Sequence, residues 1–214
     1  MKRIRHWPYA AVPVTAAFFS LLLMGHALWI PVKAELAQWL IERSWEKTLA
    51  GQPAAQPWPW ADTRALGILT VPGLGIRQMI LEGNSGRNLA FGPVLMNGVE
   101  SGEDLVLNGH RDTHFRFLQH LRKGERLEIQ LPGRTRWFEV TQIDIVDSRQ
   151  TELVIEPGVQ RLSLVTCYPF DTPVAGGPKR YVVTALPVES NQPFLAATGQ
   201  VRQAPSLRYS PSSG

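Results

Sequence analysis

The chain has 214 residues, which is enough for one ordinary domain with additional terminal segments. Its hydrophobic fraction of 44% supports a real core, and its charged fraction of 19% argues against general disorder. The net charge of +4 is small and the basic residues are scattered, so no nucleic-acid partner is expected.

An apolar segment follows the basic amino terminus. Lys2, Arg3 and Arg5 precede residues 6–32, which contain no Lys, Arg, Asp or Glu. The centre of this segment, Ala10–Ile30, has 21 residues, about the length that a helix needs to span a bilayer. Basic residues before the span predict an amino terminus inside the cell and an exported remainder. We therefore expect residues 1–32 to form a cytoplasmic basic end and a transmembrane anchor.

A cleaved signal peptide is the alternative for this segment, because Gly25-His26-Ala27 loosely resembles a cleavage site. The apolar run is long for a signal peptide, and Trp29 suits the interface of a membrane. These features favour a retained signal-anchor. Pro31 is expected to mark the end of the transmembrane helix.

Two segments follow the predicted span. Residues 33–50 carry apolar side chains at helical spacing, namely Leu36, Leu40, Ile41, Trp45 and Leu49. This pattern predicts an amphipathic helix that lies on the membrane, covers the next domain or is an ordinary packed helix. Residues 51–65 are rich in Pro and Trp and predict a stiff linker, with Trp58 and Trp60 docked on the domain.

Short apolar segments separated by Gly and Pro turns occupy residues 66–187. Strands are predicted at 68–71, 76–80, 104–108, 126–131, 135–146, 161–166 and 180–186, with another candidate at 152–155. Leu131–Arg134 is expected to form a hairpin turn. Seven or eight strands with few helices predict a mainly β fold, a closed and mostly antiparallel barrel.

The remaining segments have weaker patterns. Residues 114–121 predict a short helix, and residues 86–96 a loop or helical turn. Residues 188–214 are rich in Pro, Ser, Gln and Gly, so we expect a loosely ordered tail.

The only cysteine, Cys167, follows the predicted strand 161–166 directly. A lone thiol cannot form a disulfide within the chain, so it is either inert packing or a nucleophile. The end of a strand would present Cys167 at the rim of the sheet, where distant side chains can gather. His110 and Arg180 are its predicted companions, because an imidazole or guanidinium favours the thiolate.

Each companion also has an ordinary interpretation, His110 as a turn residue and Arg180 as a solvated edge residue. His110, His114 and Cys167 could instead bind a metal, but a further ligand is missing and we expect none. His114 is expected to cap or start the short helix. Asp112 is expected to hold an imidazole or to start that helix.

Three motifs around these residues resemble one enzyme family. Ser163-Leu-Val-Thr-Cys167 resembles the TLxTC signature of the sortases, with Ser in place of the first Thr. His110 stands in the Gly-His-Arg context of that family, and Arg180 follows the cysteine by about a dozen residues. The resemblance covers about Leu66–Leu186. Sortases are membrane-anchored cysteine transpeptidases with an eight-stranded barrel.

The resemblance agrees with the roles we expect from the chemistry. Cys167 attacks a peptide carbonyl and forms an acyl-thioester, and His110 transfers protons. Arg180 holds the oxyanion, with Asp171 as a possible contact of its guanidinium, and Thr166 orients Arg180 or the substrate. No cofactor is expected.

The resemblance implies an exported protein substrate with a C-terminal LPxTG-like sorting motif. The amine acceptor, in peptidoglycan or in a protein, stays open. The segments Cys-Tyr-Pro-Phe-Asp and Gly-Gly-Pro-x-Arg-Tyr are most similar to sortases reported from Gram-negative bacteria, which implies a domain that faces the periplasm from the inner membrane. A cysteine protease and a non-catalytic, membrane-tethered peptide-binding barrel remain alternatives.

Overall fold

The computed structural model describes residues 7–52, 55–83, 85–96, 104–156, 158–172, 176–189 and 209–210. The predictions for the basic amino terminus and for most of the tail 188–214 lie outside these residues. The chain divides into two compact units, residues 1–40 and 41–214.

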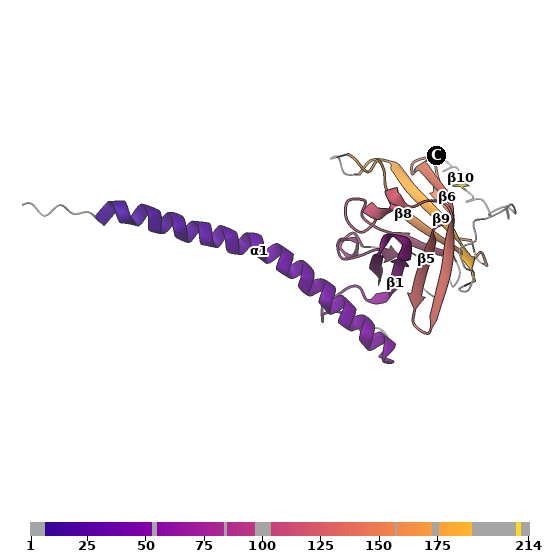
Figure 1. The fold of residues 1–214 in the computed structure, drawn as a ribbon, viewed down its shortest axis with the longest axis horizontal. Coiled ribbons are helices and arrows are strands. Elements are labelled where there is room, and N and C mark those ends of the chain that lie inside the picture. The colour runs from indigo at the N-terminus through magenta and orange to yellow at the C-terminus, as the bar shows by residue number, and fades with distance from the viewer. Residues whose placement is uncertain are drawn as a thin grey trace, which may run out of the picture. The chain divides into compact units, whose positions relative to one another are not determined.

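Helix α1, Trp7–Leu49, is one continuous helix of 43 residues (Figure 1). The expectation that it ends at Pro31 is wrong, since both Pro13 and Pro31 lie inside it. A proline removes one backbone hydrogen bond, which a long helix with good helix formers on both sides can lose without ending.

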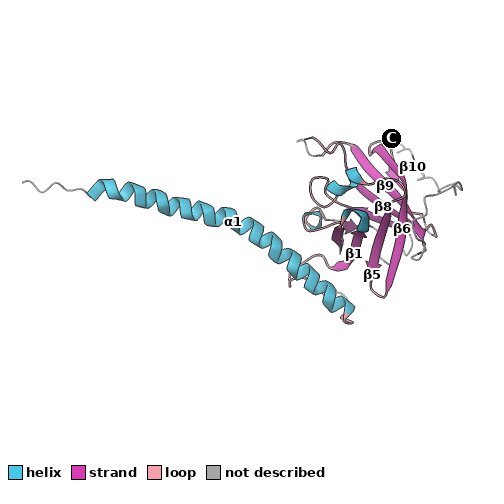
Figure 2. Ribbon diagram, in the orientation of Figure 1, coloured by secondary structure: helices cyan, strands magenta, loops and turns pink. Residues whose placement is uncertain are grey.

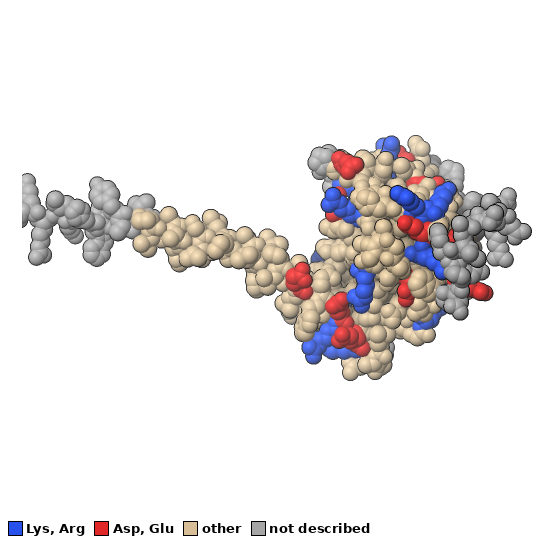
Figure 3. All heavy atoms as spheres, viewed as in Figure 1, with Lys and Arg blue, Asp and Glu red and all other residues tan. Residues whose placement is uncertain are grey.

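The apolar part of α1 suits a membrane span by length and composition. The stretch from Pro13 to Leu49 has a mean hydropathy of 1.6 in its most apolar window, and residues 13–36 are exposed. A signal sequence near an amino terminus would meet the same criterion. In Figure 3 charged side chains are spread over the barrel unit, whereas the start of the described helix carries none.

The second unit contains a closed barrel of eight strands, as the fold class predicted (Figure 2). Its strands, in the order in which they pair around the barrel, are β1 Ala65–Val71, β2 Ile76–Glu82, β3 Val94–Leu95, β4 Asp104–Asn108, β8 Arg161–Cys167, β9 Lys179–Val188, β6 Arg134–Asp147 and β5 Arg126–Leu131. Short 3-10 helices, η1 Pro72–Leu74, η2 Asn88–Ala90 and η4 Arg116–His120, lie between strands.

Most strand pairs of the barrel are antiparallel, as predicted, and two are parallel, β2 with β3 and β4 with β8. The observed strands differ from the predicted ones in two places. Strand β3 lies in a segment predicted as a loop or helical turn, because two residues are too few for a periodic signal. The candidate strand at 152–155 is β7, Glu152–Leu153, which pairs outside the barrel with β10, Tyr209–Ser210.

Alternating apolar residues fill the barrel. In β5, Leu127, Ile129 and Leu131 are buried, whereas the intervening residues are partly exposed. These side chains belong to one cluster with the apolar residues of β1, β4, β8 and β9. Each such side chain contributes about 1.5–3 kcal/mol when fully buried.

A second apolar cluster lies on the outside of the barrel. Ile41 and Trp45, from the last turns of α1, are buried there against β1, β2 and β3. The amphipathic pattern of this segment therefore corresponds to packing on the domain. Trp58 joins this cluster, with its ring centroid 5.4 Å from that of Phe91, but Trp60 is 83% exposed. Docking is confirmed for Trp58 and wrong for Trp60.

Candidate active site

Strands β4 and β8 bring His110 and Cys167 to the same edge of the sheet. The two strands are parallel neighbours, and their last paired residues are Asn108 and Val165. His110 and Cys167 each follow two residues later. The backbone N–H of Gly109 continues the ladder by donating to the Val165 carbonyl at 3.2 Å. The side chains of His110 and Cys167 therefore start from the same end of the β4–β8 pair.

Arg180 lies directly opposite Cys167 in the antiparallel pair of β8 and β9. Residues directly opposite on adjacent strands have Cβ atoms about 4.5–5.5 Å apart. Because Leu164 and Val183 point into the core, alternation puts Cys167 and Arg180 on the other face. The Arg180 guanidinium donates to the carbonyls of Gly177 and Lys179. All three predicted residues thus lie at one end of β8, with His110 exposed.

Thr166 and Gly109 hold the backbone at this edge. The Thr166 side chain is 3% exposed, and its hydroxyl donates to the Gly109 carbonyl at 2.7 Å. A Cβ at residue 109 would lie 2.6 Å from Cγ of the buried Phe115, so only glycine fits. Thr166 therefore contacts the backbone that leads to His110, and its expected role toward Arg180 or the substrate stays a prediction.

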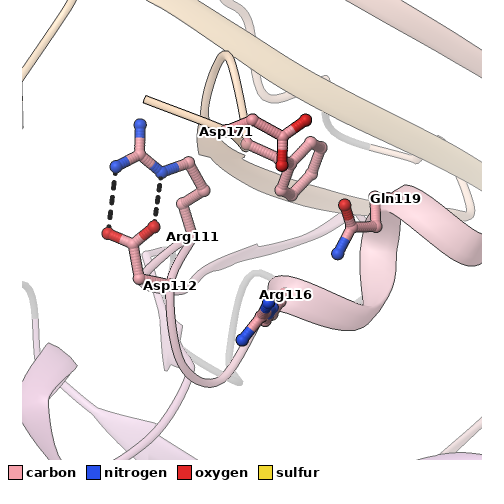
Figure 4. A pocket seen from close by; sticks show the side chains of 6 residues that line it. Arg111, Asp112, Arg116, Gln119 and Asp171 are labelled. Atoms are coloured by element: carbon pink, nitrogen blue, oxygen red, sulfur yellow. Dashed lines mark hydrogen bonds and ion pairs between the residues drawn. The ribbon is translucent and has the colours of Figure 1, made fainter. Parts of the chain in front are cut away.

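Arg111 is the residue that sequence reasoning missed. Its side chain is only 6% exposed, although it follows the exposed His110. Its guanidinium donates to the Asp112 carboxylate at 2.7 and 3.0 Å (Figure 4). It also donates to the Pro169 carbonyl at 2.7 Å and to the Thr172 carbonyl at 3.0 Å. The only sequence signal was the Gly-His-Arg context, which says nothing about burial.

Asp112 is paired with Arg111, and within the described residues its carboxylate has no hydrogen bond to an imidazole and does not cap η4. The hydrogen bonds from Arg111 hold the pKa of the Asp112 carboxyl below its ordinary value, so this carboxylate stays ionised. The N-terminal cap position of η4 is occupied by Phe115 without a side-chain hydrogen bond.

A cavity of about 190 Å³ adjoins this edge of the barrel (Figure 4). Its lining comes from the segment after His110, from η4 and from the loop after Cys167, and consists of Arg111, Asp112, Arg116, Gln119, Phe170 and Asp171. Asp171 lies in this lining, and within the described residues it forms no ion pair with Arg180.

The family model described as "Sortase domain" matches residues 69–188. The chain belongs to the sortase family. Sortases are cysteine transpeptidases that act on peptide bonds. Sortase D of Bacillus subtilis (strain 168) is 34% identical to this chain over 125 residues, which are 56% of this chain and 62% of that protein. This sortase therefore spans less than two thirds of the length of that curated relative.

Solved sortase structures have the same fold. Sortase A from Corynebacterium diphtheriae is 24% identical with a TM-score of 0.53, covering 64% of this chain and 67% of that one. Sortase A of Listeria monocytogenes is 21% identical with a TM-score of 0.52, covering 58% of this chain and 88% of that one. The Gram-negative subgroup stays a prediction.

His114 of this sortase contacts strand β2 and the short helix η2. Its Nδ1 lies 3.1 Å from Oε1 of Gln78 in β2, and its Nε2 lies 3.3 Å from the Ala90 carbonyl in η2. His114 therefore ties η2 to β2, and the expectation that it caps the following helix is wrong. Burial lowers the pKa of His114, although the hydrogen bond to Ala90 acts in the opposite direction.

The lowered pKa of His114 predicts a pH-dependent stability. The unfolded chain binds the His114 proton more tightly than the folded one, so the free energy of unfolding should fall as the pH drops below the ordinary value of about 6.5. It should level off below the folded-state pKa. We expect His114→Gln to reduce this fall, as measured by urea unfolding of the full chain in detergent between pH 8 and pH 5.

His120→Gln is the matched control, because His120 is an exposed residue of η4. It should keep the wild-type pH dependence. Identical pH slopes for the wild type and His114→Gln would contradict the prediction.

Proposed function

We propose that this sortase is a membrane-anchored transpeptidase that cleaves an LPxTG-like sorting motif through an acyl-thioester on Cys167. The acyl group then passes to an amine of peptidoglycan or protein. The observation that carries the proposal is the shared end of β4 and β8, with Arg180 directly opposite Cys167. Family membership supports the transpeptidase class.

In the first half-reaction the Cys167 thiolate attacks the carbonyl carbon of the scissile peptide bond. The C–N bond breaks, and protonated His110 gives its proton to the leaving amine. In the second half-reaction an incoming amine attacks the thioester carbonyl and loses a proton to His110. The C–S bond breaks, which regenerates the Cys167 thiolate and protonated His110.

Arg180 is proposed to bind the oxyanion that forms in both steps. For this its guanidinium must donate hydrogen bonds to the substrate, in addition to or in place of those to Gly177 and Lys179. Removing one such donor typically costs about 3–4 kcal/mol, so Arg180→Ala should lower kcat by about 10²–10³-fold. The measurement is steady-state cleavage of a fluorogenic LPxTG-type peptide.

Lys179→Ala is the control for this prediction, because Lys179 is the exposed neighbour on the same strand. Its kcat should stay within about threefold of wild type, the effect of an ordinary surface substitution. Equal losses in both variants would remove Arg180 from the proposed mechanism.

The location of the domain is also part of the proposal. The apolar helix α1 is proposed to anchor the chain in the inner membrane, with residues 66–187 as the catalytic domain on the periplasmic side. This location can be tested by thiol labelling of Cys167 with a membrane-impermeant reagent in intact spheroplasts. Labelling only after lysis would contradict this topology.

Mass spectrometry tests the proposed function directly. With an LPxTG-type peptide the full chain in detergent should gain the mass of the acyl fragment on Cys167. Added hydroxylamine should then yield a hydroxamate. A free acid as the only product in the presence of amine would favour the protease alternative, and no adduct with an unreactive Cys167 would favour the binding barrel.

A further inference from the structure

We propose that Arg111 is a positioning residue of the candidate active site, whose guanidinium fixes the loop after Cys167 against the segment that carries His110. This inference deepens the proposed function and depends on it for the role of Cys167 as the nucleophile. It goes beyond the three residues that the family resemblance indicates.

The contacts of Arg111 join two segments that are distant in sequence. Arg111 directly follows His110, whereas its acceptors Pro169 and Thr172 lie two and five residues after Cys167. One buried side chain therefore connects the segment that carries His110 with the loop that follows the nucleophile. Hydrogen bonds to charged groups contribute about 1.5–3 kcal/mol, more than neutral ones.

Only a guanidinium meets this geometry. Its planar fork donates from Nε and Nη2 to the Asp112 carboxylate (Figure 4). At the same time Nη1 and Nη2 donate to the carbonyls of Pro169 and Thr172. Lysine would keep the charge but has a single nitrogen, which cannot satisfy acceptors on opposite sides. The substitutions to Lys and Gln therefore separate the charge of Arg111 from its hydrogen-bonding geometry.

The carboxylate of Asp112 keeps Arg111 charged. The pKa of Arg111 is raised, first by its hydrogen bond to Asp112 and against the effect of burial. A charged donor makes shorter and stronger hydrogen bonds than a neutral one, so the bonds from Arg111 to the Pro169 and Thr172 carbonyls are strong.

Other charged groups face the same edge of the barrel. His110 comes from the end of β4, Arg180 from β9, and Arg116 and Asp171 line the adjoining cavity. The matched control for Arg111 is therefore an arginine outside this lining. Arg122 serves this purpose, because it is exposed, follows η4 and does not line the cavity.

The experiment measures two properties of Arg111→Gln, Arg111→Lys and Arg122→Gln in the full chain in detergent. The first is the rate of Cys167 alkylation by iodoacetamide at pH 7, which reports whether the thiol stays accessible. The second is kcat and KM for a fluorogenic LPxTG-type peptide.

We expect Arg111→Gln and Arg111→Lys to lower kcat by roughly 10²-fold, because a nucleophile displaced by about 1 Å loses that much. Both variants should keep alkylation of Cys167 within about threefold of wild type. Arg122→Gln should change each value by less than threefold.

An unchanged kcat in Arg111→Gln would overturn the inference, and so would an equal effect of Arg122→Gln. Alkylation that slows as much as kcat would indicate altered access to Cys167 and would also overturn it. If Arg111→Gln does not fold, Arg111→Lys still tests the hydrogen-bonding role through kcat. A wild-type chain that cleaves no peptide would contradict the proposed function, whereas Arg111 variants that cleave as well as an active wild type would contradict only this inference.

Discussion

Replacement of Cys167 with alanine is expected to lower peptide cleavage by roughly 10⁴–10⁶-fold, because the covalent intermediate can no longer form. Cys167 is only partly buried and belongs to neither apolar cluster, so the midpoint of thermal unfolding should change little. The measurement combines hydroxamate formation with thermal unfolding of the full chain. It separates a loss of chemistry from a loss of fold.

Ser163→Ala is the matched control for this variant. Ser163 lies on the same strand and the same face as Cys167 and differs from alanine by one oxygen atom. We expect it to keep turnover within about tenfold of wild type, since it lies four residues from the strand end. Turnover that survives in Cys167→Ala would refute the role of Cys167 as the nucleophile.

Asp104→Ala is expected to destabilise the fold by about 3–5 kcal/mol, because it leaves the buried guanidinium of Arg161 without its counter-charge. Both side chains are 1% exposed. Asp104 accepts hydrogen bonds from Arg161 and from the backbone N–H of Glu156, and Arg161 also donates to the Val154 carbonyl at 3.2 Å. Urea unfolding of the full chain in detergent measures the change.

Two further variants check the physical reason for this loss. The double substitution Asp104→Leu with Arg161→Met removes both charges and should recover much of the stability, since buried ion pairs can be replaced by apolar residues. Arg149→Ala breaks the exposed pair with Asp147 and should change stability little. A loss below about 1 kcal/mol in Asp104→Ala would show that water reaches this pair.

The ion pair and the candidate site lie at opposite ends of the same two strands. Asp104 and Arg161 form the first register pair of β4 and β8, and Asn108 and Val165 form the last. A variant of the ion pair should therefore affect turnover mainly through the folded fraction. We expect kcat per folded molecule to stay close to wild type in the double variant.

Local patterns were sufficient to predict most of the barrel. The alternation in β5 and the hairpin between β5 and β6 were predicted because period-two burial and turn residues are local properties. The predicted strand at 104–108 has the bounds of β4. The two-residue strand β3 was missed, since its pairing with β2 and β4 is decided by tertiary contacts.

Helix α1 also shows where local sequence patterns stop being sufficient. Pro31 is a local signal for a helix end, but α1 continues to Leu49. Beyond Pro31 the segment is rich in good helix formers, and Ile41 and Trp45 at its end are buried against the barrel. Tertiary packing of this last part outweighs the one backbone hydrogen bond lost at the proline.

The sequence by itself determined the mainly β class, the apolar amino-terminal segment and the identities of Cys167, His110 and Arg180 as candidates, since periodicity, composition and motifs are carried by neighbouring residues. Only the tertiary structure decided that β4 and β8 run in parallel and end together, that Asp112 pairs with Arg111, and that Arg111 is buried between two distant loops. These outcomes depend on which segments become neighbours when the barrel closes. No local pattern encodes that pairing, because it follows from the packing of the whole sheet.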